Sequence, residues 1–240
     1  MHAAVVELYR VFKPYRLGSD FGGCECCVSA ADSARIATIP LRELTTQDLN
    51  RFAFKSMTTW GDVRHFKHFL PRLLELCLQD YLAFNDPETL LGKLMYGRWR
   101  TWPMIEQSAV EQFLLQFWRH QLSQQFVPRQ ASNINEVIGG LAAASNSIQV
   151  YLDDWGLNTT QKSVFHLGEL VSSVAGEIMT AGRVRSLWGD PEIASGELTQ
   201  WICSDAVQQL LTKFRSELAD PFPFLADQLT GIRAAVRESD

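Results

Sequence analysis

The residues best suited to chemistry in this sequence are three cysteines in a glycine-rich stretch, GGCECC, that runs from Gly22 to Cys27. Cys24, Cys26 and Cys27 form both a Cys-x-Cys and a Cys-x-x-Cys pair. Two thiolates at such a spacing can hold one tetrahedral metal ion, because the loop turns the sulfurs inward and the glycines let backbone N–H groups face them. The stretch therefore predicts a metal site, with zinc as the candidate ion.

The rest of the ligand set must come from other parts of the chain. A structural zinc site needs four ligands, and the loop supplies two or three. The candidates are His65 and His68, followed by Cys77 and Cys203, none of which has a fixed zinc-finger spacing to the loop. A redox-active dithiol and plain loop residues are the alternatives for the cysteines. The redox hypothesis is the weaker of the two, because no βαβ pattern surrounds the motif.

The two histidines allow two interpretations. Histidines at positions i and i+3 share one face of a helix and can reach the same ion. His65 and His68 also lie beside three basic residues, Arg64, Lys67 and Arg72, and this arrangement is typical of a solvated, mildly basic surface. Because the spacing alone is unspecific, the surface interpretation is favoured.

The histidines lie in residues 60–84, the stretch around which the chain is organised. Its apolar residues recur at spacings of three and four and predict one buried helix face: Phe66, Phe69, Leu70, Leu73, Leu74, Cys77, Tyr81 and Phe84. Gly61 is expected to end the preceding helix and Asp62 to cap the next. Pro71 costs about 3 kcal/mol in a helix interior, so we expect the helix to bend or restart there.

The remaining chain also predicts helices. Ser29 with Asp32, and Thr45 with Asp48, resemble capping boxes. Alternation of period two is missing, so we expect an all-α fold, either an irregular multi-helix bundle or stacked helical pairs. We expect residues 1–240 to form one domain, with a subdivision near 128–133 as the alternative. The expected helices cover about 3–12, 29–37, 45–60, 62–84, 87–96, 103–122, 134–150, 160–181, 192–218 and 224–237, with a turn at 153–158.

Composition restricts the class of protein and the cellular compartment that we expect. With 46% hydrophobic residues, 20% charged residues and a net charge of −5, the chain is an ordinary globular one. The basic clusters are small, so we do not expect nucleic-acid binding. No apolar run reaches the ~18 residues of a membrane span, and no signal peptide is evident. Five cysteines without such a peptide favour reduced thiols in the cytoplasm.

Several segments together resemble a group of uncharacterised bacterial cytosolic proteins. They are Cys24-x-Cys26-Cys27, PLREL at 40–44, Thr59-Trp-Gly61 and FKHFLPRLLEL at 66–76, of which FLPRLLEL is the most specific. The resemblance covers about the first third of the chain. It implies a bacterial, intracellular setting and brings no activity with it.

Three functional hypotheses follow, of which nucleic-acid binding through a basic face at Arg64, Lys67 and Arg72 is the least favoured. The leading one is a non-enzymatic, helical, cytosolic module that binds a partner protein and carries a metal-stapled N-terminal loop. It rests on the lack of a nucleophile elbow, a phosphate-binding glycine loop or a His-Glu-x-x-His helix. The alternative is a metal-dependent enzyme whose centre lies between the Cys24–Cys27 loop and His65 and His68, with Glu75 as an acid/base group. For Glu75 itself, an ion pair with Arg72 on the helix surface is favoured.

Overall fold

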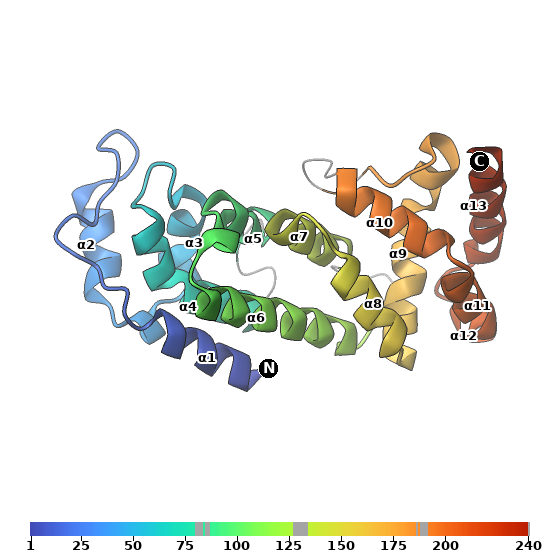
Figure 1. Cartoon of the computed structure of the whole chain (residues 1–240), viewed down its shortest axis with the longest axis horizontal. Helices are drawn as coiled ribbons and strands as arrows, with labels where there is room; N and C mark the ends of the chain where they lie inside the picture. The colour runs from blue at the N-terminus through green and yellow to red at the C-terminus, as the bar shows by residue number, and fades with distance from the viewer. Residues whose placement is uncertain (80–83, 85–86, 127–133, 186, 188–191, 240) are drawn as a thin grey trace. The chain divides into compact units, whose positions relative to one another are not determined.

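The computed structural model describes residues 1–79, 84, 87–126, 134–185, 187 and 192–239 (Figure 1). These residues form helices and no strand, which confirms the predicted all-α class. The α-helices are α1 His2–Phe12, α2 Ala30–Thr38, α3 Thr46–Lys55, α4 Val63–Gln79, α5 Pro87–Tyr96, α6 Met104–Ser123, α7 Ile134–Ser145, α8 Gln149–Leu157, α9 Gln161–Ala181, α10 Glu192–Cys203, α11 Asp205–Lys213, α12 Arg215–Leu218 and α13 Leu225–Ser239. Two 3₁₀ helices, η1 Leu41–Glu43 and η3 Trp99–Thr101, accompany them.

Contacts between residues divide the chain into two compact units, Met1–Phe117 and Trp118–Asp240. The first contains the cysteine loop and the histidines of α4, so it is the unit that matters for the candidate site. The subdivision that the sequence suggests near 128–133 lies outside the described residues.

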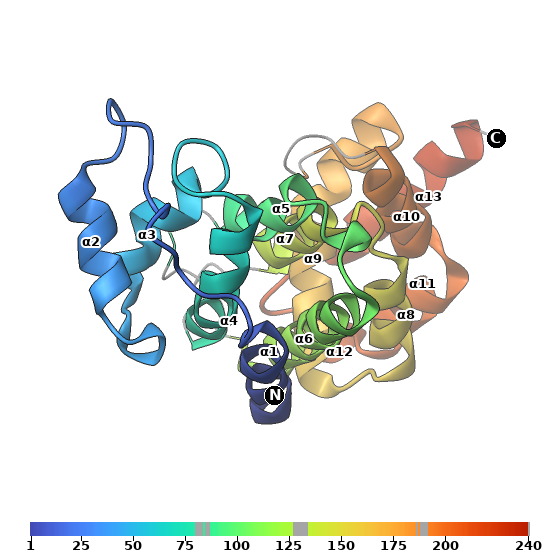
Figure 2. The ribbon, with the colours of Figure 1, turned by 60° about the vertical axis from the view of Figure 1, so that its left-hand side comes forward.

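The two predicted capping boxes are confirmed, and they also join α2 to α3. The Ser29 hydroxyl accepts the Asp32 N–H, the Thr45 hydroxyl accepts the Asp48 N–H, and each carboxylate bonds back to the cap N–H. Each carboxylate in addition pairs with an arginine of the other helix, namely Asp32 with Arg51 and Asp48 with Arg35. The reciprocal pairs fix α2 beside α3, as both ribbon views show (Figure 2).

The prediction that the helix restarts at Pro71 is wrong, because α4 runs through Pro71 without a break. Phe66, Phe69, Leu70 and Leu73 of this helix have no exposed surface. Burial contributes roughly 1.5–3 kcal/mol for each such side chain, which together exceeds the ~3 kcal/mol cost of the proline. The predicted apolar face is confirmed within α4 as far as Cys77, and Phe84 is also buried beyond the end of α4, whereas Tyr81 lies outside the described residues.

The junction before α4 differs from the expectation in where α3 ends. α3 ends at Lys55 rather than near Trp60, and Met57 then adopts a positive φ of 62°. Asp62 caps α4 as expected, since its Oδ1 accepts the N–H groups of Arg64 and His65. The residues between the two helices therefore form a separate turn, against which the cysteine loop packs.

Aromatic side chains fill the core beneath this turn. The rings of Phe52 and Phe69 lie 4.5 Å apart between centroids, and Phe52 and Trp60 lie 5.5 Å apart. Phe21, from the segment before the cysteines, completes the cluster at 5.6 Å from Phe69. The tryptophans of the Trp99–Trp102 segment are also buried, so they serve packing.

In the second unit, the expected single helix over 134–150 and turn over 153–158 are wrong. Asn146 has a positive φ of 63° and separates α7 from α8, and α8 covers most of the expected turn. Asp154, within the expected turn, is buried, and its Oδ1 lies 2.9 Å from Arg119 Nε. The ion pair with Arg119 explains why this carboxylate tolerates burial. Elsewhere in the unit, α9 is capped by Thr160 and packs along α13.

A pH dependence of stability follows from His166, a buried residue of α9. Burial lowers the pKa of its imidazole below the ordinary value, and the carbonyl of Gln124 and the charge of Glu169 offset this only in part. Below pH ~6.5 the unfolded chain therefore binds a proton that the folded chain does not, so stability falls as the pH drops. Urea denaturation at pH 7 and pH 5.5 should show this loss, and His166→Gln should reduce it. An equal loss in the variant would assign the dependence to other groups.

Candidate metal centre

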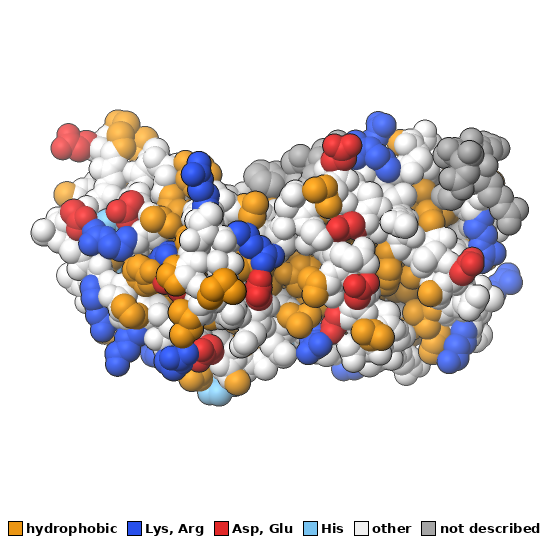
Figure 3. All heavy atoms as spheres, in the orientation of Figure 1, with side chains coloured by type: hydrophobic (Ala, Val, Ile, Leu, Met, Phe, Trp, Pro, Cys, Tyr) orange, Lys and Arg blue, Asp and Glu red, His pale blue; other side chains and the backbone are white. Residues whose placement is uncertain are grey.

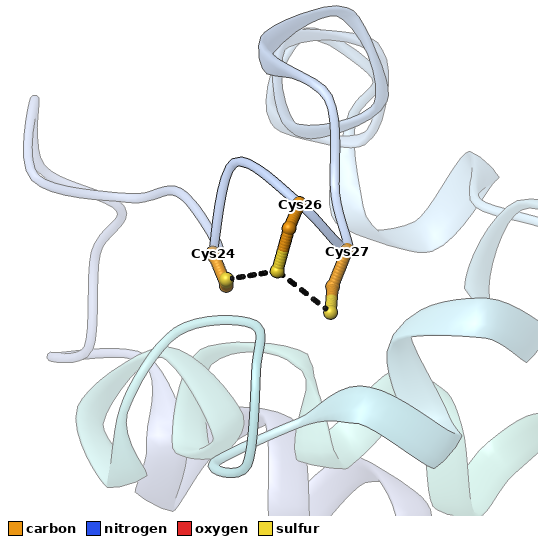
Figure 4. A group of neighbouring side chains, drawn as sticks. All are labelled: Cys24, Cys26 and Cys27. Atoms are coloured by element: carbon orange, nitrogen blue, oxygen red, sulfur yellow. Dashed lines mark hydrogen bonds between the residues drawn. The ribbon is translucent and has the colours of Figure 1, made fainter.

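The cysteine loop is held to the turn before α4 by the backbone. The N–H of Cys24 donates to the carbonyl of Thr59 at 2.8 Å, and the N–H of Gly61 donates to the carbonyl of Gly22 at 2.9 Å. After this short bridge the chain turns tightly, because the N–H of Cys27 donates back to the carbonyl of Cys24 at 2.8 Å. The turn places the three cysteine side chains on the same side of the loop (Figure 4).

A second support for the loop was not predicted from the sequence. Arg51, on α3, donates from Nη2 to the carbonyl of Cys27 at 2.6 Å while its Nη1 pairs with Asp32 at 2.7 Å. One guanidinium group thus links the end of the cysteine turn to the cap of α2. Nothing in the local pattern around Arg51 distinguishes it from any other exposed arginine on a helix.

The three sulfurs form one group of potential ligand atoms. Cys24 Sγ lies 2.7 Å from Cys26 Sγ, which lies 3.4 Å from Cys27 Sγ, and all three atoms fall within 4.8 Å of one another. Cys24 and Cys26 are exposed and Cys27 is half-buried. Among the described residues this is the only group of three or more histidine, cysteine or acidic side chains with donor atoms so close together.

The arrangement makes the thiols unequal acids. The hydrogen bond from Cys26 lowers the pKa of Cys24, since it stabilises the thiolate. The same bond to Cys24 raises the pKa of Cys26 to about 11, and Cys27 raises it further in the same direction. Cys24 is therefore the first of the pair to ionise and the first to offer a metal its thiolate.

The loop needs little rearrangement to hold an ion. Zinc binds thiolates at about 2.3 Å, so two sulfurs on one tetrahedral ion lie roughly 3.8 Å apart. The Cys26–Cys27 separation of 3.4 Å is close to this value, whereas Cys24 and Cys26, at 2.7 Å, must move apart by about 1 Å. Both of these side chains are exposed, so rotation about their side-chain bonds can supply the movement. The loop can thus hold a metal ion.

The structure places His65 beside the loop but gives both ring nitrogens other neighbours. His65 lines a hollow of about 330 Å³ together with Cys24 and is itself buried. Its Nδ1 lies 2.8 Å from Asp62 Oδ1, and its Nε2 lies 3.3 Å from Arg64 Nη2. The favoured surface interpretation is therefore wrong for His65, because the ring packs 5.2 Å from Phe21 in the aromatic core. No histidine nitrogen belongs to the sulfur group in the described part of the chain.

His68 lies in a different environment. It is half-buried, and its Nδ1 lies 3.0 Å from the carbonyl oxygen of Tyr15. It lines a separate hollow with α1 and η1 residues, and the linings of the two hollows share no residue. The structure therefore does not bring His65 and His68 together on one site. Although they are one helical turn apart on α4, His65 lies beside the cysteine loop and His68 beside Tyr15.

The other candidate residues have other surroundings. Cys77 is buried in α4, and Cys203 is half-buried at the end of α10. All five cysteines lie within the described residues, and none is in a disulfide. Glu75 accepts hydrogen bonds from Tyr9 at 2.6 Å and from Arg72 at 2.7 Å, which confirms the expected ion pair with Arg72.

The basic cluster around the histidines is neutralised by carboxylates. Arg64 pairs with Asp20 and Arg72 with Glu75. Lys67 is buried, and its Nζ lies 2.7 Å from Glu106 Oε2. These three cations, which the sequence places beside the histidines, do not form a free basic face.

Gly23 permits the close approach of the loop to the turn, and this leads to a prediction. A Cβ atom there would lie 2.7 Å from the carbonyl oxygen of Thr59 and 2.7 Å from Val28 Cβ, whereas a Cβ on Gly22 would meet nothing within 4 Å. We expect Gly23→Ala to lower the free energy of unfolding by about 1–3 kcal/mol, as overpacking does, and to weaken metal binding. Gly22→Ala should change either quantity little. Equal effects in chemical denaturation would contradict this assignment.

Comparisons with protein families, with curated proteins and with solved structures find no match to this chain. Within the described ranges, none of the helices combines the length and the apolar character that crossing a bilayer requires.

Proposed function

We propose that this protein is a non-enzymatic, cytoplasmic helical module that binds a partner protein and carries one zinc ion on Cys24, Cys26 and Cys27. The observation that supports it most is the clustering of three accessible sulfurs on one turn. Three thiolates leave the fourth position of a tetrahedral zinc ion open. On an exposed loop, that position can accept a ligand from another macromolecule, such as a cysteine or histidine side chain. The ion would then serve as a docking point as well as a staple.

The first experiment asks whether the native protein carries the ion. Untagged protein, purified without chelators under reducing conditions, should contain about one zinc ion per chain, because three thiolates at one turn suit that ion. Cys203→Ala is the matched control, since it removes a thiol that lies outside the sulfur group. Absence of metal from both the native protein and this control, after mild reduction and supply of zinc, would contradict the proposal.

The second experiment asks about the partner. Crosslinking and capture from a native lysate should recover a protein with the zinc-loaded wild type, and Cys24→Ser/Cys27→Ser should recover less of it. Equal recovery by the wild type and the variant would show that partner binding does not depend on the cysteine loop. Recovery of no protein would count against the interaction hypothesis itself.

A metal-dependent enzyme is the second candidate, and the open fourth position favours it, since catalytic zinc sites combine three protein ligands with a water molecule. Such an enzyme also needs an acid/base group beside the ion. The hydrogen bonds of Glu75 and the separate hollow of His68 give this candidate less support. Hydrolysis of generic ester or phosphoester substrates that requires zinc and is lost in the cysteine variant would favour the enzyme over the docking module.

A further inference from the structure

A second hollow of the first unit, of about 460 Å³, has a lining that is independent of the cysteines. It lies between the end of α1, the segment that follows it, η1 and α4. Three cations line it, Lys13, Arg16 and Arg42, against one carboxylate, Glu43. Hollows of this size are typical of sites for small molecules.

The three cations differ from most other basic residues around them in their pairing. Arg10, Arg35, Arg51, Arg64 and Arg72 each lie against a carboxylate. No carboxylate lies within ion-pair distance of Lys13, Arg16 or Arg42 in the described ranges. The guanidinium of Arg42 instead lies 3.6 Å over the ring of Tyr9. Figure 3 shows Lys and Arg side chains gathered near α1 and α2 on the face turned to the viewer. The charge of Lys13, Arg16 and Arg42 is thus available to a ligand.

His68 adds a polar group to the same hollow. A carbonyl oxygen only accepts hydrogen bonds, so the contact with Tyr15 makes Nδ1 the donor and leaves Nε2 as the other polar atom of the ring. Burial lowers the pKa of His68, and the nearby charge of Arg16 lowers it further. Arg16 and His68 line the same hollow.

Aromatic residues give the hollow apolar walls that are fixed in place. The Tyr9 hydroxyl donates to Glu75 at 2.6 Å, and the Tyr15 hydroxyl donates to Glu106 at 2.5 Å. Phe12, which also lines the hollow, packs against Trp102 with the ring centroids 5.9 Å apart. Because these contacts anchor the rings, a ligand would meet a preformed surface and little ordering would be required on binding.

We infer that this hollow binds a small organic phosphate, with its phosphate group held by Lys13, Arg16 and Arg42 and its planar or apolar body held against Tyr9 and Tyr15. Three cations match the charge of a phosphate monoester, of −1.5 to −2 near pH 7, better than that of a single carboxylate. The planar guanidinium groups suit the oxygens of such a group. This site is separate from the proposed metal centre and does not depend on it.

The test measures the binding of 1-naphthyl phosphate, the probe, to the full chain by isothermal titration calorimetry. We expect saturable binding of one probe per chain and much weaker binding of 1-naphthol and of inorganic phosphate, each of which offers half of the required groups. Arg16→Ala/Arg42→Ala should weaken binding about a hundredfold or more, because it removes two charge-assisted contacts with the phosphate group.

The control is Arg10→Ala/Arg35→Ala, which removes the same charge from two arginines that already have carboxylate partners. It should change the affinity less than about twofold, apart from the general effect of net charge. Lys13→Glu is a second variant that leaves the Arg42 contact with Tyr9 in place, and it should also weaken binding. Absence of saturable binding, equal loss in both double variants, or equal affinity for 1-naphthol would overturn the inference.

Discussion

Cys24→Ser/Cys27→Ser is expected to lose zinc affinity by at least about 10³-fold. Structural zinc in small four-ligand sites contributes about 10–16 kcal/mol at pH 7, or roughly 2.5–4 kcal/mol for each ligand. The double variant removes two of the three sulfurs in the group, which predicts a loss of about 5–8 kcal/mol. Titration of the metal-free protein in competition with a chromogenic chelator measures this loss directly.

The single variants should not be equivalent. The pKa of Cys24 is lowered by its hydrogen bond with Cys26, whereas the pKa of Cys26 is raised to about 11. Zinc binding must therefore displace a proton from Cys26 at greater cost. We expect Cys24→Ser to weaken binding more than Cys26→Ser near neutral pH. For the wild type, apparent affinity should rise with pH, because the thiols release protons when the metal binds. An affinity independent of pH would contradict thiolate ligation.

Lys67→Met is expected to destabilise the first unit by about 3–5 kcal/mol, the usual cost of leaving one partner of a buried ion pair alone. Lys67 Nζ lies 2.7 Å from Glu106 Oε2 and 3.0 Å from the Tyr15 hydroxyl, and both charged side chains are buried. The ammonium group also lies 4.3 Å from the ring of Trp102. Removal of the charge leaves Glu106 as a carboxylate without its cation, although Tyr15 still donates to it.

A double-mutant cycle separates the pair from the packing around it. Lys67→Met/Glu106→Gln removes both charges, so it should recover much of the stability that Lys67→Met loses. Thermal and urea denaturation measure the free energies. Arg10→Met breaks an exposed pair with Glu7 on α1 and should leave the midpoint unchanged. If the double variant were as unstable as the sum of its single variants, the two residues would not act as a pair.

Local sequence signals predicted the elements whose determinants lie within a few residues. The capping boxes at Ser29 and Thr45, the cap at Asp62 and the buried face of α4 depend on spacings of three and four, so they were evident from sequence alone. Of the two outcomes predicted at Pro71, a bend or a restart, the restart is wrong, because the burial of neighbouring side chains in the tertiary structure outweighs the local cost of the proline. The break between α7 and α8 was also not predicted, since nothing in the residues around Asn146 marks its positive φ.

The candidate metal centre was predictable in part. The three cysteines are close in sequence, so their spacing already implied that their sulfurs could meet. The positions of His65 and His68 depend on what α4 packs against, and the i, i+3 spacing alone did not reveal that they line separate hollows. The support from Arg51 and the buried Lys67–Glu106 pair join residues far apart in the chain, and a single sequence carries no signal for either.

The most direct test of the central claim is zinc K-edge X-ray absorption of the natively purified, zinc-loaded protein. If Cys24, Cys26 and Cys27 hold the ion and the fourth position is open, the fine structure should require three sulfur atoms at about 2.3 Å and one oxygen or nitrogen atom at about 2.0 Å. The spectrum of Cys203→Ala should be the same. A first shell made only of oxygen and nitrogen atoms, or one with fewer than three sulfurs, would contradict a zinc centre on this loop.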